Sequence, residues 1–236
     1  MLLLSIVKFF IYVPIRFFYP TKVIGGKNVP KKGACVIAGN HKSNLDPFLL
    51  VLCCRRQPRM LGKDSLFKGK FKNWFFRSCG FHPVNRGKTD IAAIKFGLSM
   101  LKDGQCLGIF PEGTRVKDES IELGQFKNGA AMFASRTSSP IIPMIILNKP
   151  KMFRRNILMF GTPFMPEGND YDAITQVLTD KMKEMRIHLE SKNKKKKHHT
   201  VESVIGEVVH DVVVVAAKVA ETVEAANVVE TIIESV

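Results

Sequence analysis

Metal-site spacings are missing from this sequence. Its few cysteines include no C-x-x-C pair and no Cys/His cluster with the spacing of a zinc site, so no metal centre is predicted. An odd number of thiols in mostly apolar runs also argues against a disulfide framework, and is typical of reduced, buried cysteines in a cytosolic setting. The five residues are Cys35, Cys53, Cys54, Cys79 and Cys106.

Acidic residues are scarce before residue 200. Residues 1–199 hold 35 Lys and Arg against 14 Asp and Glu, a net charge of +21, whereas residues 200–236 hold seven acids and one base. A surface this basic attracts polyanions: nucleic acid, phosphorylated small molecules or an anionic membrane face. At 236 residues the chain is long enough to bury one sizeable core, with some chain left over for attachments.

The first twenty residues lack the pattern of a signal peptide. Their charges fall within the apolar run rather than before it, and no small-residue cleavage site follows. Lys8 in mid-segment and Pro14 favour a helix lying in the membrane interface over a transmembrane span or a core helix, the two alternatives. Residues 1–20 are therefore predicted to be a membrane-anchoring helix, with Lys8, Phe9, Phe10, Arg16, Phe17 and Phe18 as lipid contacts.

Short apolar strands alternate with helical patterns between residues 21 and 191. This alternation predicts an α/β fold with a mostly parallel central sheet flanked by helices. The basic, aromatic stretch 67–79 is expected to be partly helical and to offer Trp74 as a further membrane contact. Strands are expected within 21–30 and at 34–38, 58–61, 80–85, 105–110, 141–147 and 157–160, and helices at 46–55, 89–102, 127–136 and 171–190.

The end of the chain changes character. Residues 192–200 form a basic run that predicts a solvated linker. Residues 201–236 are rich in Val, Ala and Glu and keep a 4-3 apolar spacing over five heptads, which predicts a C-terminal helical extension. Its many valines lower helix propensity, so it needs a partner surface: another copy, and hence self-association, the preceding domain, or the bilayer.

A polar loop joins the strand at 34–38 to the next helix and contains His41 and Asp46. Asp46 occupies an N-cap position and Pro47 the first helical position. A turn between His41 and Asp46 lets the carboxylate reach the imidazole, and a base held by an acid is suited to take a proton from a hydroxyl. The plain alternative is a capping aspartate beside an unrelated surface histidine.

Three further blocks follow other predicted strands. Arg86 ends the GFHPVNR block, and the FPEGTR block places Glu112 and Arg115 in a tight loop. Ligands bind at such strand ends in open α/β sheets, although either arginine alone is equally consistent with a structural role. The last block, PIIP, places Pro140 and Pro143 around a strand start.

These four blocks, in this order, resemble the glycerolipid acyltransferase family that includes the 1-acylglycerol-3-phosphate acyltransferases. The resemblance covers residues 23–164, and it implies that residues 21–191 form an acyltransferase domain with His41 and Asp46 as the catalytic pair. It also implies that the acceptor and its phosphate are bound by Lys63, Arg86, Glu112, Gly113, Thr114 and Arg115. His82 departs from the family pattern and has no predicted role.

The chemistry of these residue types fits direct acyl transfer from a thioester to an alcohol. No Ser or Cys is placed as a covalent nucleophile, and always-charged arginines suit a phosphorylated acceptor. The expected reaction converts lysophosphatidic acid to phosphatidic acid, with acyl-CoA or acyl-carrier protein as co-substrate and no cofactor. The alternatives are glycerol 3-phosphate or another lysolipid as acceptor, or a non-catalytic module binding nucleic acid or membrane. The leading hypothesis involves membrane lipids and no nucleic acid, and predicts the cytoplasmic face of a membrane as the location.

Overall fold

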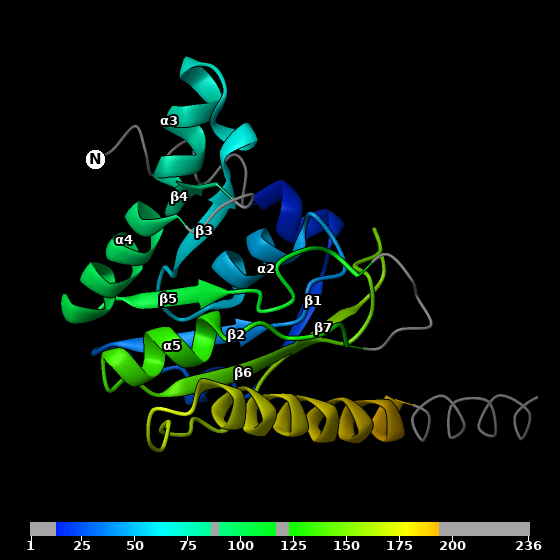
Figure 1. Cartoon of the computed structure of the whole chain (residues 1–236). Coiled ribbons are helices and arrows are strands. Elements are labelled where there is room, and N and C mark those ends of the chain that lie inside the picture. The colour runs from blue at the N-terminus through cyan, green and yellow to red at the C-terminus, as the bar shows by residue number, and fades with distance from the viewer. Residues whose placement is uncertain (1–12, 86–89, 117–122, 194–236) are drawn as a thin grey trace, which may run out of the picture. The chain divides into compact units, whose positions relative to one another are not determined.

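A computed structural model describes residues 13–85, 90–116 and 123–193. Its strands are β1 (Thr21–Ile24), β2 (Cys35–Gly39), β3 (Arg59–Lys63), β4 (Phe81–Val84), β5 (Cys106–Ile109), β6 (Ile141–Ile146) and β7 (Asn156–Phe160). They form one seven-stranded sheet in the order β1-β7-β6-β2-β5-β3-β4 (Figure 1). The mostly parallel sheet predicted from the alternating pattern is confirmed.

Helices lie between the strands at the predicted places. They are α2 (Asp46–Cys53), α3 (Lys70–Ser78), α4 (Ile91–Lys102) and α5 (Gly129–Arg136), with the short 3₁₀ turns η1 (Gly26–Asn28) and η2 (Asp64–Phe67). Residues 13–18 and 171–193 are also helical. The last helix thus runs past residue 191, the predicted end of the domain.

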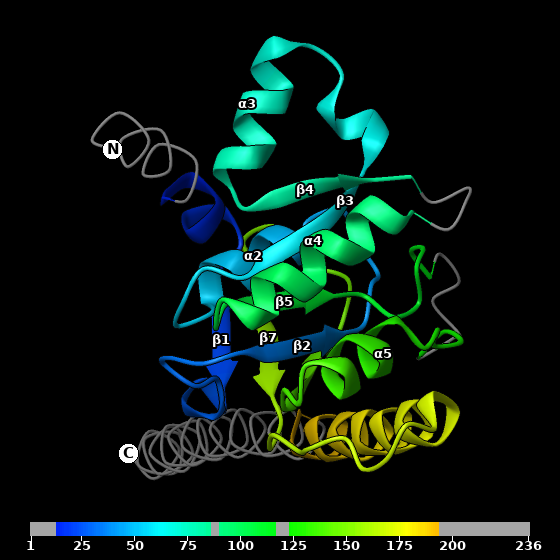
Figure 2. The same ribbon diagram turned by 60° about the vertical axis from the view of Figure 1, so that its left-hand side comes forward.

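Both faces of the sheet are covered, which explains why its central strands are continuous apolar runs rather than alternating ones. On one face, Cys35 and Ile37 of β2 share an apolar cluster with Leu49 and Leu50 of α2. On the other face, α4 and α5 pack against β5 and β2 (Figure 2). Every residue of β2 and of β6 is buried as a result.

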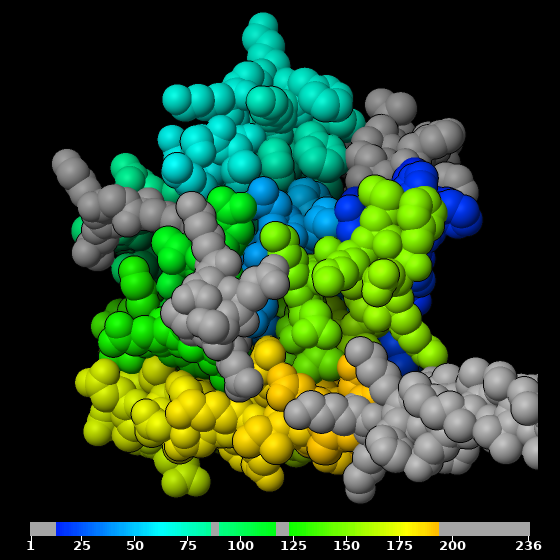
Figure 3. All heavy atoms as spheres, turned by 90° about the vertical axis from the view of Figure 1, so that its right-hand side faces the viewer, coloured from blue at the N-terminus to red at the C-terminus, as the bar shows by residue number. Residues whose placement is uncertain are grey.

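One edge of the sheet collects the carboxyl ends of five strands. β2 is parallel to β5 and to β6, and β3 is parallel to β4 and to β5. β7 is antiparallel to β6, and β1 runs parallel to β7, so these two strands begin where the other five end. We call this side of the sheet the carboxyl edge. Figure 3 faces it.

The chain divides into two compact units, residues 1–187 and 188–236. All labelled elements belong to the first unit, and of the second the structure describes the helix end at 188–193. Within the described ranges, no helix has both the length and the apolar character needed to cross a bilayer. The predicted contacts Lys8, Phe9 and Phe10, the candidate Arg86 and the heptad segment 201–236 lie outside the described residues.

All five cysteines are free. Cys35 and Cys106 are paired in register on β2 and β5, and the Cys106 thiol forms hydrogen bonds with those of Cys35 and Cys54. The bond from Cys106, helped by the Arg56 backbone and charge, lowers the pKa of Cys54 to about 7. Burial instead raises the pKa of the neighbouring Cys53, so the two adjacent thiols differ in acidity.

Alkylation by iodoacetamide should therefore distinguish these two half-buried thiols. The thiolate is the reactive form, so Cys54 should react with a midpoint near pH 7, whereas Cys53 should react only at higher pH. The single variants Cys53→Ser and Cys54→Ser assign each rate, followed by mass spectrometry as a function of pH. Equal pH dependence of the two rates would contradict the raised pKa of Cys53 and the lowered pKa of Cys54.

Candidate active site

His41 follows the carboxyl end of β2, two residues after Gly39, and is buried with 7% of its surface exposed. The preceding residue, Asn40, is fully buried and fixes this exit from the strand. Its side chain donates to the Ile146 carbonyl at 3.0 Å and accepts from the Ile146 N–H at 2.8 Å. The amide of Asn40 thus continues the pairing between β2 and β6 by one step.

The structure brings the imidazole of His41 and the carboxylate of Asp46 together. Nδ1 of His41 lies 3.0 Å from Oδ2 of Asp46. An ionised carboxylate only accepts hydrogen bonds, so Nδ1 carries the hydrogen and Nε2 keeps its lone pair. The pair therefore presents Nε2 as a proton acceptor, which is the arrangement that a general base needs.

The predicted N-cap role of Asp46 is wrong. Asp46 is the first residue of α2, the N-cap position belongs to Leu45, and no side chain caps the helix. The Asp46 carboxylate turns back into the loop, where Oδ2 accepts from the N–H groups of Lys42 and Ser43, each at 2.6 Å. Its hydrogen bonds thus shape the turn that presents His41, rather than the start of the helix.

A second buried carboxylate, that of Glu112, braces His41 from the loop that follows the neighbouring strand β5. Oε2 of Glu112 accepts from the backbone N–H of His41 at 2.9 Å, and Oε1 accepts from the N–H of Gly124 at 3.1 Å. Burial raises the pKa of Glu112, and these two N–H groups oppose the shift. Glu112, predicted to help bind the acceptor, thus holds together the two loops that contain His41 and Gly124.

Two more contacts complete the setting of the histidine. The N–H of Val116 donates to the His41 carbonyl at 2.9 Å. The ring of Phe110 stacks on the imidazole, with centroids 4.5 Å apart and planes 26° apart. The FPEGTR block therefore holds both the backbone and the ring plane of His41.

Glu112→Gln should destabilise the fold by about 1–3 kcal/mol, because a buried amide can accept only one of the two hydrogen bonds and leaves a buried N–H unpaired. Urea unfolding measures the free energy of unfolding. The exposed Glu167 provides a matched control, since Glu167→Gln should change stability by less than about 0.5 kcal/mol. Equal stability of the two variants would show that Glu112 does not brace the loops.

The FPEGTR loop turns at Gly113, whose φ of 70° is strained for any side chain other than glycine. Thr114 and Arg115, which follow, are exposed. A hollow of about 380 Å³ opens beside this loop. It is lined by Glu112, Thr114, Val116, Gly124, Gln125, Phe126 and Lys127.

Lys127 is a cation at this site that sequence reasoning did not single out. Its N–H donates to the Pro111 carbonyl at 2.9 Å. The side chain runs past Gly113, with Nζ 3.4 Å from the place that a Cβ would take there. The available signal was the stretch FKNGAA at residues 126–131, which lies within the range of the family resemblance.

The other predicted cations belong to neighbouring strand ends. Lys63 ends β3 and is exposed, in register with Val84 at the end of β4. Arg86 itself is outside the described residues, but a hydrogen bond joins Asn85 and Asp90, the residues on either side of the segment 86–89. Asp90 accepts from the N–H of Asn85 at 2.8 Å and caps α4 by accepting from Ala93 at 3.0 Å.

His82, which had no predicted role, stacks on Phe96 of α4 with ring centroids 3.8 Å apart. Burial lowers its pKa, so the neutral form that packs well is favoured. Its contact with α4 explains the residue as part of the packing between α4 and β4. It lies apart from the contacts made by His41.

The predicted membrane contacts that the structure describes are all exposed. Arg16, Phe17 and Phe18 lie on the helix 13–18, and Arg16 also donates to the Thr21 carbonyl at 3.2 Å. Trp74 lies on α3, with 38% of its surface exposed. Their contact with lipid remains a prediction.

Comparison with known proteins decides the family. The family model described as Acyltransferase matches residues 20–147, which include β1 to β6 and all four blocks in full. The chain belongs to the acyltransferase family. The match ends at residue 147, shortly after PIIP, the fourth block.

Several curated relatives of this chain are named 1-acyl-sn-glycerol-3-phosphate acyltransferase. A 1-acyl-sn-glycerol-3-phosphate acyltransferase of Borreliella burgdorferi is 32% identical over 58% of this chain and 54% of that protein. One of Bacillus subtilis is 28% identical over 72% of this chain and 89% of that protein. The chain spans about half the length of several of the curated relatives that it matches.

A solved structure shares the fold. The crystal structure of the 1-acyl-sn-glycerophosphate acyltransferase PlsC from Thermotoga maritima matches with a TM-score of 0.56 and 26% identity. The match covers 70% of this chain and 72% of that one. It supports the α/β architecture, with helices on both faces of a mostly parallel sheet.

Proposed function

We propose that this acyltransferase is a 1-acyl-sn-glycerol-3-phosphate O-acyltransferase, which transfers a fatty acyl group from a thioester to lysophosphatidic acid and forms phosphatidic acid. The observation that carries the proposal is the buried His41–Asp46 pair at the carboxyl edge, 3.0 Å apart and braced by Glu112. The names of the relatives and of the solved structure supply the acceptor.

The reaction proceeds by direct transfer. Nε2 of His41 takes the proton of the glycerol hydroxyl while its oxygen attacks the thioester carbonyl, and the resulting tetrahedral intermediate expels the thiolate. The new imidazolium returns its proton to the departing sulfur. Asp46 keeps Nδ1 protonated and stabilises the imidazolium, and Phe110 fixes the plane of the ring.

The phosphate of the acceptor is bound by cations at the carboxyl edge. Lys127 lines the hollow beside the FPEGTR loop, Arg115 belongs to that loop, and Lys63 ends β3, the next strand but one from β2. Arg86 completes the set in this proposal. Arginine offers bidentate hydrogen bonds to phosphate and lysine a mobile point charge, so the mixture suits a flexible phosphoglycerol headgroup.

The lipid acceptor requires the site to meet a membrane. The exposed Phe17 and Phe18, together with the net charge of +21 over residues 1–199, support attachment to an anionic membrane surface on its cytoplasmic side. In this proposal the acyl donor is acyl-CoA or acyl-carrier protein, both of which reach the site from the aqueous phase.

A panel of donors and acceptors tests the function. Purified full-length protein in detergent micelles should convert labelled acyl-CoA or acyl-carrier protein and lysophosphatidic acid into phosphatidic acid. Monoacylglycerol, which lacks only the phosphate, should be a much poorer acceptor. Transfer to glycerol 3-phosphate or to another lysolipid in preference would move the proposal to that acceptor. No transfer from either donor to any of these acceptors would overturn it in favour of a binding module.

A further inference from the structure

The largest exposed aromatic side chains outside α3 gather at one place, although they come from distant parts of the chain. Phe17 of the helix 13–18 is 70% exposed, and Phe153 of the loop between β6 and β7 is 65% exposed. Both rings pack on Phe18, each with its centroid 5.3 Å from that of Phe18. Met152, next to Phe153, is half exposed. We call Phe17, Phe18, Met152 and Phe153 the aromatic patch.

The loop that carries Met152 and Phe153 is built rather than loose. The N–H of Phe153 donates to the Phe18 carbonyl at 2.7 Å. The buried side chain of Asn156 accepts from the Lys151 N–H at 2.9 Å and donates to the Arg154 carbonyl at 3.1 Å. These bonds tie both ends of the turn to the start of β7.

Phe153 also has a strained backbone. Its φ of 54° lies in the left-handed region, which is rare for a bulky residue and persists only where surrounding contacts impose it. Here the contacts hold the ring in solvent instead of allowing it to fold inward. A soluble surface gains nothing from a strained and exposed phenylalanine, whereas an apolar partner does.

The charges around the patch have one sign. The segment from Leu147 to Asn156 contains no acidic residue, and its four cations are all exposed. Among the described residues, none of the four forms an ion pair. They are Lys149, Lys151, Arg154 and Arg155. Apolar rings surrounded by unpaired cations match an anionic bilayer, which offers acyl chains beneath a layer of phosphates.

The patch lies at the same edge of the sheet as His41. β6 ends at Ile146, where Asn40 binds it, and β7 begins at Asn156, in register with Thr21 of β1. In Figure 3 the lime loop and the dark blue helix 13–18 lie side by side, to the right of the blue segment that follows β2. An open hollow of about 590 Å³ adjoins the patch, lined by Val13, Arg16, Phe17 and Leu52.

We propose that the loop 149–155 is a membrane-docking element that inserts Met152 and Phe153 into an anionic bilayer, with its cations on the lipid phosphates and the aromatic patch completed by the helix 13–18. Docking through this loop turns the carboxyl edge toward the bilayer, so a lipid hydroxyl reaches Nε2 of His41 over a short path. The access of a lipid hydroxyl to His41 rests on the proposed function, whereas the docking of the loop on a bilayer does not.

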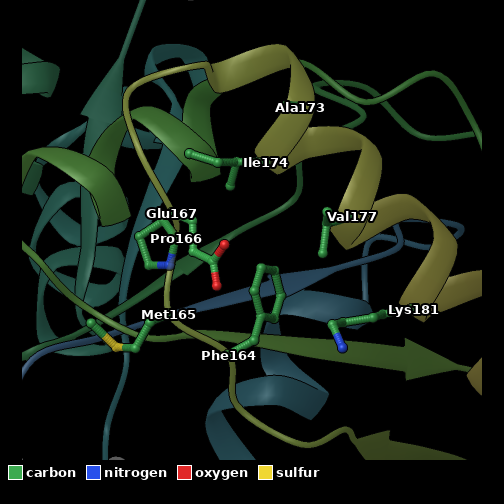
Figure 4. A pocket seen from close by; sticks show the side chains of 8 residues that line it. All are labelled: Phe164, Met165, Pro166, Glu167, Ala173, Ile174, Val177 and Lys181. Carbon is green, nitrogen blue, oxygen red and sulfur yellow. The ribbon is translucent and has the colours of Figure 1, made fainter.

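The chain offers a matched control surface. Figure 4 shows a hollow of about 510 Å³ with the exposed Met165 and Val177 on its wall and Lys181 beside them. The residues that line this hollow follow β7 in the chain. One of them, Phe164, forms an isolated β-bridge with Ile141, the first residue of β6, so the hollow lies at the edge of the sheet opposite the carboxyl edge. Met165 and Val177 are 53% and 45% exposed, comparable to Met152 and Phe153, but this surface should not meet the bilayer.

The test is sedimentation of the full chain with vesicles of phosphatidylglycerol and phosphatidylcholine. Met152→Ser/Phe153→Asn should lower the partition coefficient about tenfold or more, since burial of one large apolar side chain is worth that much. Asparagine tolerates the left-handed backbone, so the loop should keep its shape. Met165→Ser/Val177→Ser should bind as the wild type does, and neutral vesicles should bind all variants weakly.

Two further readouts separate docking from chemistry. In a Trp74→Phe background, Phe153→Trp should show a blue shift of tryptophan emission when anionic vesicles are added. Met152→Ser/Phe153→Asn should transfer to a short-chain lysophosphatidate in solution at the wild-type rate, whereas absence of this transfer in the wild type itself would count against the proposed function and not against docking. Wild-type partitioning of the Phe153 variant, an equal loss in the control, or no blue shift would overturn the proposal. Association of wild-type copies through the patch without vesicles would assign the surface to self-association instead.

Discussion

His41→Ala should reduce acyl transfer by about 10²–10⁴-fold, the usual contribution of a general base, while the protein remains folded. Nε2 of the imidazole is the proposed proton acceptor, and no neighbouring side chain can take its place in accepting the proton. The measurement is the initial rate of phosphatidic acid formation in detergent micelles. Circular dichroism of the variant should overlay that of the wild type.

The histidine control for this variant is His188, which is exposed on the helix 171–193. His188→Ala should retain full activity. An active and folded His41→Ala protein would show that the base has been assigned to the wrong residue, whatever the acceptor proves to be.

Asp46→Asn should cost about 10³–10⁴-fold in rate, as in serine proteases in which the acid beside the histidine is replaced by an amide. Oδ2 of Asp46 accepts from three donors: Nδ1 of His41 and the N–H groups of Lys42 and Ser43. An amide oxygen that keeps the two backbone bonds no longer provides a charge for the imidazolium. The loop should therefore survive while the base fails.

The free energy of unfolding separates this role from a purely structural one. Asp46→Asn should unfold at nearly the wild-type urea concentration, because its amide oxygen keeps the two backbone hydrogen bonds. Asp46→Ala should lose both rate and stability, since it removes the acceptor of the Lys42 and Ser43 N–H groups. A fully active Asp46→Asn enzyme would contradict the orienting role.

Periodicity and strand-end chemistry predicted most of the architecture, because the central strands are buried on both faces and their apolar runs are unmistakable. The helix 91–102, for example, begins one residue after its cap, Asp90, within the predicted range. The order of the strands was beyond the sequence. Which strands pair depends on long-range packing, and β1 and β7 run opposite to the rest.

The residue types of the site and the contact between His41 and Asp46 were predicted, but the other hydrogen bonds of the site were not. The spacing of His41 and Asp46 is compatible both with a capped helix and with a carboxylate turned back into the loop, and only the folded backbone distinguishes them. The motif predicts Glu112 as an acceptor-binding residue, yet its carboxylate accepts hydrogen bonds from the backbone of His41 and Gly124. Phe153 follows no periodic pattern, so its exposure became visible only in the structure.

One measurement tests the central claim, that His41 drives acyl transfer in a single step. The protein is incubated with a thioester labelled in its acyl group, with and without lysophosphatidic acid, quenched, and separated into protein and lipid. We expect label in phosphatidic acid only when the acceptor is present, none bound to the protein, and transfer by His41→Ala reduced about a hundredfold or more. An acyl-protein that forms without acceptor, or transfer by His41→Ala at the wild-type rate, would contradict it.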